Sequence, residues 1–204
     1  MLGQAGIDAA AGKTAHKLQQ LLLAEMHHRI KNLLAMVQSI AIQSLRSAPT
    51  LAAAQTAVAA RISALSRAHD IMLSSEEEVA PLAMLLAGMT GPFGQENFSI
   101  DVPDIKFEAS TAVYVSLVIN ELCTNAVKYG ALSIPSGRVS LVGTPGGGAL
   151  LLTWVEQGGP VVREPTRRSF GTRLIETTAP GKTKLEFRPD GVFCEMWIPV
   201  RDKA

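Results

Sequence analysis

The first residues of this sequence that could carry out chemistry surround a histidine. His28 is followed by Arg29, and Lys31 and Asn32 lie within the next helical turn. Two cations and an amide would stabilise a negatively charged group on the imidazole. Glu25, one turn earlier, could orient or deprotonate the ring, and an imidazole with a pKa of about 6.5 is a competent nucleophile near neutral pH. Position alone suits an ordinary surface histidine, whereas these neighbours favour a reactive one.

A second group of polar residues consists of Glu121, Asn125 and Lys128, spaced four and three residues apart. Residues at this spacing share one face of a helix. The ordinary interpretation is the solvent face of an amphipathic helix. However, an acid, an amide and an amine are together suited to holding a hydrated Mg²⁺ and a polyphosphate, because Mg²⁺ keeps most of its waters and takes few protein oxygens.

Two segments that contain glycine complete the candidate motifs. The segment Trp154–Pro160 (WVEQGGP) predicts a strand that ends in the carboxylate of Glu156, which could accept a hydrogen bond from an exocyclic amine such as that of adenine. The glycines after it would let the backbone approach a planar base closely. In the segment Arg167–Ile175 (RRSFGTRLI), Gly171 and Thr172 open a short helix whose free N–H groups suit a phosphate. Each motif is weak alone, but their order along one chain is specific.

Two long amphipathic helices are predicted to position the histidine. Between Lys13 and Leu45 there is neither proline nor glycine, and apolar residues recur at alternating spacings of four and three. This heptad seam consists of Leu22, Met26, Ile30, Leu33, Val37 and Ile40. In that register His28 lies opposite the seam and faces solvent. After a break at Arg46–Pro49, a second helix follows over Leu51–Met72, so an antiparallel hairpin is expected, and two copies would form a four-helix bundle.

The second half of the chain predicts a different architecture. The polar segment Ser74–Glu78 is expected to link two domains. Beyond it the patterns predict helices over Pro81–Met89, Ser110–Tyr129 and Thr172–Thr178 and strands over Phe98–Val102, Arg138–Val142, Ala149–Val155, Lys184–Phe187 and Val192–Ile198. The glycine-rich Thr144–Gly148 and the Asp190–Gly191 pair predict hairpin turns. The predicted fold class is α+β, a helical hairpin followed by a sandwich with helices on one face of a mixed sheet.

Composition excludes several classes of protein. The chain has 204 residues, of which 47% are hydrophobic and 18% charged, with a formal net charge of +1. This near-balance argues against a general binder of nucleic acids or anionic membranes. Cys123 and Cys194 lie far apart, which indicates a reducing compartment and excludes a cysteine-based zinc site. No apolar run approaches the roughly 20 residues of a membrane span, and no signal peptide is apparent, so we expect a cytoplasmic protein without membrane insertion.

Four segments, in this order, resemble the motifs of sensor histidine kinases of the HWE type. The segment Glu25–Asn32 resembles their phosphoacceptor box, and Asn120–Ser133 resembles their nucleotide-binding N box. Trp154–Pro160 matches the first glycine box and Phe170–Ile175 the second. The resemblance extends from about residue 21 to residue 199, nearly the whole chain.

The resemblance implies a flexible N-terminus at residues 1–12, a dimerisation and phosphotransfer hairpin over 13–74 and a Bergerat-type ATP-binding α/β sandwich over 79–200. It implies that His28 is phosphorylated from ATP in the presence of Mg²⁺ and that the phosphoryl group passes to an aspartate of a response-regulator receiver domain. The implied binding residues are Asn125 for Mg²⁺ with Glu121 assisting, Lys128 and Tyr129 for phosphate or base, Glu156 and Gly158 for adenine, and Gly171 and Thr172 for the phosphates.

The sequence departs from the family pattern at two positions. The histidine that helps to name the HWE group is Asn120 here, and the first glycine of the second glycine box is Ser169. The roughly 20 residues before His28 are too few for a sensory domain, so either an excised core or input from a partner sensor is expected. These features leave an alternative open, namely a histidine phosphotransfer protein or a receiver phosphatase that makes little or no use of ATP.

Overall fold

A computed structural model describes the backbone of residues 2–74, 79–165 and 181–200. Side chains are described at the same positions except 2–15, 17, 18, 22, 25, 28 and 29. The linker predicted at Ser74–Glu78, apart from Ser74, and the helix predicted at Thr172–Thr178 therefore lie outside the described residues. The chain divides into two compact units, Met1–Gln43 and Ser44–Ala204.

The first unit is part of helix α1 (Leu2–Ser47). The helix begins at Leu2 rather than at Lys13, so the segment 1–12, expected to be flexible, is helical from its second residue. Five alanines in the first 15 residues and the absence of proline there favour that extension. On the predicted seam, Met26 is 57% and Ile30 48% exposed in the single chain, which leaves this stretch of the seam accessible to a partner helix.

Helix α2 (Leu51–Leu73) begins where the sequence predicts, because the side chain of Thr50 caps it by accepting a hydrogen bond from the N–H of Ala53 at 3.1 Å. The sequence predicts an apolar face of Leu51, Ala54, Val58, Ile62, Leu65 and Met72, and the buried face agrees with it only in part. Leu51 and Ile62 are exposed, whereas the buried positions are Ala54, Arg61, Ala64, Leu65, Ala68 and Met72. Helix α2 packs on α4, and three of its six buried positions are alanines.

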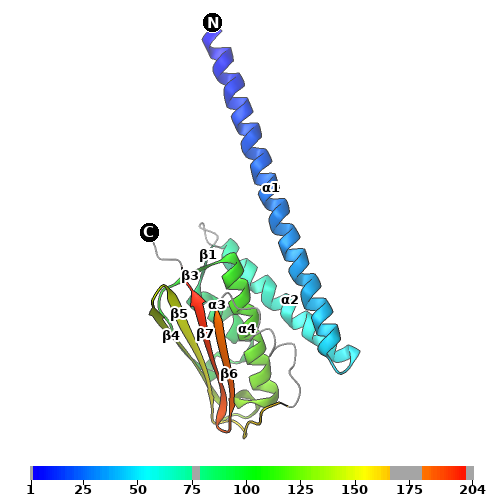
Figure 1. Cartoon of the computed structure of the whole chain (residues 1–204), viewed down its shortest axis with the longest axis vertical. Helices are drawn as coiled ribbons and strands as arrows, with labels where there is room; N and C mark the ends of the chain where they lie inside the picture. Colours follow the sequence, from blue (N-terminus) through cyan, green and yellow to red (C-terminus); the bar gives the residue numbers. More distant parts are fainter. Residues whose placement is uncertain (1, 75–78, 166–180, 201–204) are drawn as a thin grey trace. The chain divides into compact units, whose positions relative to one another are not determined.

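The remaining elements of the second unit form the predicted α+β domain. Its helices are α3 (Leu82–Thr90) and α4 (Ala109–Tyr129), with short 3-10 turns η1 (Gly91–Phe93), η2 (Gln95–Asn97) and η3 (Ala131–Ser133). Its strands are β1 (Val79–Pro81), β2 (Phe98–Asp101), β3 (Lys106–Glu108), β4 (Arg138–Gly146), β5 (Ala149–Gln157), β6 (Lys182–Arg188) and β7 (Gly191–Pro199). Figure 1 shows α3 and α4 together on one face of the large sheet. The predicted class and the order of helices and strands are confirmed in the described residues.

The large sheet has the strand order β2-β4-β5-β7-β6 and is mixed, because β2 runs parallel to β4 and the other neighbours are antiparallel. The tiny strands β1 and β3 form a separate antiparallel pair that the sequence did not predict. The β4–β5 turn uses Gly147 and Gly148 at φ +59° and +73°, values that favour glycine. Both predicted hairpins are therefore confirmed, and they place the ends of β5 and β6 near the C-terminal end of α4 (Figure 1).

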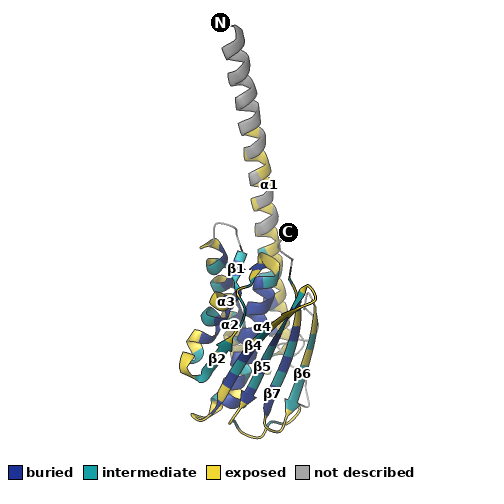
Figure 2. Cartoon of the chain, turned by 90° about the vertical axis from the view of Figure 1, so that its left-hand side faces the viewer, coloured by how far each residue is buried: buried dark blue, intermediate teal, exposed yellow. Residues whose placement is uncertain are grey.

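The core lies between α4 and the inner face of this sheet, where Figure 2 shows the buried residues concentrated. Its largest fully buried side chain is Trp154 on β5, whose ring meets that of Phe98 edge to face with 6.1 Å between centroids. Both cysteines are buried and unpaired. None of the described helices is long and apolar enough to span a membrane.

Replacing the buried indole should test this core. We expect Trp154→Ala to lower the free energy of unfolding by about 3–5 kcal/mol, because it removes a fully buried ring and leaves a cavity. Urea unfolding followed by circular dichroism measures the loss. Trp197→Ala on β7 is the matched control. Because Trp197 is 36% exposed, this substitution should lower the free energy of unfolding much less. Equal losses in the two variants would contradict this account of the core.

Candidate active site

A cavity of about 640 Å³ opens beside helix α4 in the second unit. Its lining comes from the end of α1, from α2 and α4, from residues 161–165 and from strands β6 and β7. The polar stripe predicted from the sequence faces it, because Glu121, Asn125 and Lys128 all line the cavity, together with Tyr129. Tyr129 is 73% exposed and so lies at the cavity with most of its ring accessible.

The charges around the cavity suit an anion. Among the described lining residues there are three cations, Arg61, Lys128 and Arg163, and one carboxylate, Glu121. Other parts of the wall are apolar, formed by Leu122, Leu185, Phe187 and Val192. A wall that is basic in one part and apolar in another fits a ligand with a phosphate chain and a flat ring.

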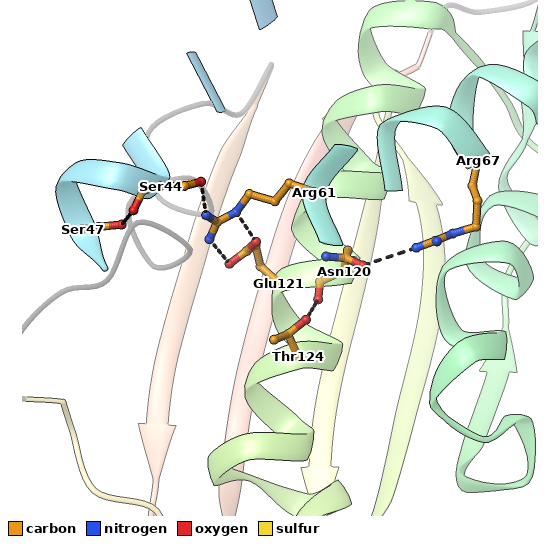
Figure 3. Close-up of polar contacts among 7 residues, drawn as sticks. All are labelled: Ser44, Ser47, Arg61, Arg67, Asn120, Glu121 and Thr124. Carbon is orange, nitrogen blue, oxygen red and sulfur yellow. Dashed lines mark hydrogen bonds and ion pairs between the residues drawn. The ribbon is translucent and has the colours of Figure 1, made fainter. Parts of the chain in front are cut away.

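Glu121 is bound by a residue that the sequence analysis did not single out. Arg61 of α2 donates from Nε to Glu121 Oε1 at 2.6 Å and from Nη2 to Oε2 at 2.8 Å. Its Nη1 donates to the hydroxyl of Ser44 at 2.6 Å. All three side chains are buried, and Figure 3 shows the guanidinium between Ser44 and Glu121. The carboxylate is therefore fixed by a bidentate, charge-assisted pair.

A sequence signal for Arg61 was present. Arg61 lies seven residues after Ala54, three before Ala64 and seven before Ala68, which places it in the stripe of small residues on α2. A long cation in such a stripe is rarely buried unless it is paired, so it indicates a charged partner on the neighbouring element. The sequence does not reveal which carboxylate that is, because Arg61 and Glu121 are 60 residues apart.

Glu156 lies behind the cavity wall rather than in it. Its side chain is buried, with Oε2 accepting from the N–H of Ala131 at 2.8 Å and Oε1 from the indole N–H of Trp154 at 3.3 Å. Burial raises the pKa of this carboxyl, and the two hydrogen bonds oppose that rise in part. Gly130, which does line the cavity, packs so closely that a Cβ there would come within 2.1 Å of Glu156 Oε2.

The other predicted site residues fall in different places. Gly158 has φ +71°, and a Cβ there would meet the carbonyl oxygen of Ser136 at 3.0 Å. A glycine at this position therefore allows close packing against the loop before β4. Glu156 and Gly158 are not among the described residues that line the cavity. Gly171 and Thr172 lie outside the described residues, and His28 lies on α1 in the first unit, with its side chain not described.

The raised pKa of Glu156 leads to a pH prediction. Folding favours the neutral form of this carboxyl more than the unfolded chain does. Its contribution to the free energy of unfolding is therefore complete below the unfolded pKa of about 4.3 and is lost as pH rises through the higher folded pKa. Wild type should therefore lose stability relative to Glu156→Gln as pH increases from about 4. Urea unfolding of both proteins between pH 4 and pH 8 measures this difference. A difference that stays constant, or that changes in the opposite direction, would refute it.

The donor set at the cavity fits a nucleotide-bound magnesium ion better than a resident metal centre. Within the described residues there is no group of three or more histidine, cysteine, aspartate or glutamate side chains that could hold a metal. Asn125 offers an amide oxygen, and the carboxylate beside it is already paired with Arg61. Mg²⁺ needs few protein oxygens when phosphates and waters supply the rest, so the residues present fit it.

Comparison with known proteins places this arrangement in context. Residues 25–104 match a family model described as HWE histidine kinase. A protein of Brucella anthropi named blue-light-activated histidine kinase is 36% identical over 205 residues, which cover 95% of this chain and 42% of that protein. The protein of the same name from Brucella ovis is 33% identical over 204 residues, with the same coverage. The chain spans less than half the length of these relatives, and the resemblance to HWE histidine kinases is confirmed.

Solved structures support the fold. The histidine kinase domain of the Erythrobacter litoralis EL346 blue-light-activated histidine kinase matches with a TM-score of 0.57 and 19% identity, over 70% of this chain and 74% of that one. A longer structure of the same kinase matches with a TM-score of 0.61 and 20% identity, over 87% of this chain and 62% of that one. At these identities the likeness concerns the fold alone.

Proposed function

Since this chain is a relative of the HWE histidine kinases, we propose that it is the catalytic core of an ATP-dependent protein-histidine kinase. In this proposal His28 takes the γ-phosphoryl group of ATP and passes it to an aspartate on a response-regulator receiver domain. The observation that supports the proposal most is the cavity beside α4, whose basic and apolar walls include the polar stripe of the N box.

Different residues around the cavity would bind different parts of ATP. Lys128 and Arg163 supply positive charge for the phosphates, and Asn125 supplies the oxygen for the magnesium ion that accompanies them. Tyr129 and the apolar wall suit the base. Bound Mg²⁺ would neutralise charge on the transferring phosphate. We assign Gly171 and Thr172 to the phosphates, as the family resemblance implies.

Glu156 and Gly158 support the cavity from behind. Glu156 holds the N–H of Ala131, and Gly158 packs against Ser136, so both fix the chain next to Gly130. Direct contact of either residue with adenine stays a prediction.

The reaction balances without any further reactant. An imidazole nitrogen of His28 attacks the γ-phosphorus, an N–P bond forms, the bond from that phosphorus to the β–γ bridging oxygen breaks, and ADP leaves with that electron pair. The imidazole nitrogen that attacks must be unprotonated, as it is near neutral pH. The protein contributes positioning and charge neutralisation rather than covalent help, as phosphoryl transfer requires.

Labelling with γ-³²P-ATP and Mg²⁺ tests this proposal. We expect label that is stable to alkali and lost in acid, together with ATP binding measured by calorimetry. ATP binding without label would contradict the kinase proposal. Absence of ATP binding together with uptake of phosphate from a phosphorylated receiver would instead establish the alternative, a histidine phosphotransfer protein.

The exposed seam of α1 supports a further part of the proposal, namely assembly as a homodimer through the helical hairpin. Met26 and Ile30 are large, apolar and about half exposed in the single chain, and burying them against a second copy would be favourable. The domain limits of 13–74 and 79–200, the cytoplasmic location and input from a sensor domain or partner protein stay predictions.

A further inference from the structure

One side chain joins three separate segments at the wall of the cavity. Arg61 of α2 makes two bonds to Glu121 of α4 and one to Ser44 near the end of α1 (Figure 3). All three groups are buried. Ser44 lies on the same helix as His28, so the guanidinium ties the end of that helix, and α2, to the helix that carries the N box.

This pair determines what the carboxylate of Glu121 can do. Both of its oxygens accept bonds from one guanidinium, at 2.6 and 2.8 Å, so its charge is balanced and its orientation fixed. Separating a buried pair leaves an uncompensated charge, which is costly unless water or a cation replaces the partner. Each oxygen keeps a second lone pair, but the bound cation lowers the basicity of the carboxylate, so Glu121 would bind magnesium or a proton more readily once the ion pair is broken.

A second polar contact between α2 and α4 is incompletely hydrogen-bonded. Arg67 reaches Asn120 through a single long bond of 3.4 Å from Nη2 to Oδ1. Its Nε, the Nδ2 of Asn120 and the Oγ of Ser116 are buried without a hydrogen-bond partner among the described residues. Unpaired buried polar atoms oppose close packing. The interface thus combines one strong anchor, Arg61, with a neighbouring region that would gain hydrogen bonds by opening to water.

We propose that Arg61 is a latch that keeps Glu121 inactive in a resting conformation, and that phosphoryl transfer requires α2 to shift on α4 and release this carboxylate. This inference rests on the proposed kinase function. Release would be favoured when the phosphates of ATP compete with Glu121 for the guanidinium, which already lines the cavity. In this scheme Arg61 acts through Glu121 and is a positioning residue.

The test compares initial rates of autophosphorylation in wild type and Arg61→Gln. Glutamine keeps a polar side chain of moderate length but cannot form the bidentate ion pair. We expect kcat to rise about fivefold or more, because the variant removes the closed state. The KM for ATP should rise as well, because the variant also lacks the guanidinium that the phosphates would contact. Arg61→Lys, which keeps the charge but not the paired geometry, should lie between the two. A purely structural role for Arg61 would lower kcat or leave it unchanged.

Two further variants serve as control and second measurement. Arg67→Gln changes the same residue type on the same helix but leaves the pair of Arg61 and Glu121 in place. Its kcat should therefore stay near the wild-type value, even if its melting temperature falls as much as that of Arg61→Gln. Ser44→Ala removes the bond from Arg61 Nη1 and keeps the ion pair, so it provides a milder opening and a smaller rise in kcat if Arg61→Gln does not fold.

Each outcome decides between the proposals. A rise in kcat in Arg61→Gln or Ser44→Ala, and not in Arg67→Gln, supports the latch. Unchanged or lower kcat in the folded latch variants, or an equal rise in Arg67→Gln, overturns it while the kinase proposal stands. A wild-type protein that binds ATP but takes up no label overturns the kinase proposal, and the latch falls with it.

Discussion

Replacing His28 by glutamine should abolish the acid-labile label entirely. Glutamine has similar polarity and is compatible with a helix, so α1 should persist, but its amide nitrogen has no lone pair available to attack phosphorus. We expect the rate of label incorporation to fall by a factor of at least about 1,000, to the background of the assay. ATP binding should be unchanged, since the cavity belongs to the second unit.

The neighbouring histidine provides the control for this variant. His27 is exposed on the same helix, and His27→Gln should incorporate label at a rate close to that of wild type. If the label persisted in His28→Gln and disappeared in His27→Gln, the phosphoacceptor would be the other histidine. Persistence in both variants would remove this segment from the reaction altogether.

Replacing Asn125 by alanine should have the second largest effect. Asn125 lines the cavity from α4, is only partly buried and can become alanine without loss of helix propensity. Because the variant removes the amide oxygen assigned to the magnesium ion, we expect affinity for the Mg²⁺ complex of a non-hydrolysable ATP analogue to fall about 100-fold. Titration calorimetry measures the affinity, and autophosphorylation should fall with it.

The matched variant on the same helix is Val127→Ala. Val127 is 42% exposed and is not among the described residues that line the cavity, so its substitution should leave nucleotide affinity within about twofold of wild type. A loss of affinity in Val127→Ala as large as in Asn125→Ala would indicate general damage to α4. Wild-type affinity in Asn125→Ala would remove that residue from the binding site.

Much of the fold could be predicted from the sequence because local patterns determine it. The long apolar stretch now seen as α4, the break before Thr50 and the glycines between β4 and β5 each specify their own structure. The short pair β1–β3 was missed, since strands of three residues carry too little periodicity to detect.

The candidate site was predicted only in part, for physical reasons. Asn125 and Lys128 could be predicted to lie on one face because residues on one helix keep a fixed spacing, and both line the cavity, while their roles stay predictions. The pairing of Arg61 with Glu121 could not be predicted because the two residues are distant in sequence, and a long-range ion pair leaves no local pattern. The contact of Glu156 with adenine stays a prediction, but its bonds to Ala131 and Trp154 could not be predicted, because only the folded chain creates them.

The order of the strands in the sheet bears on how this domain tolerates a change in the length of a connection between strands. Among the described strands β6 comes next after β5, yet β7 lies between them in the sheet, so β5 and β6 are each paired with β7 and not with each other. Lengthening such a connection adds only about 0.6 kcal/mol of closure entropy for each doubling. A change in the length of the connection from β5 to β6 can therefore leave the pairing of both strands with β7 intact.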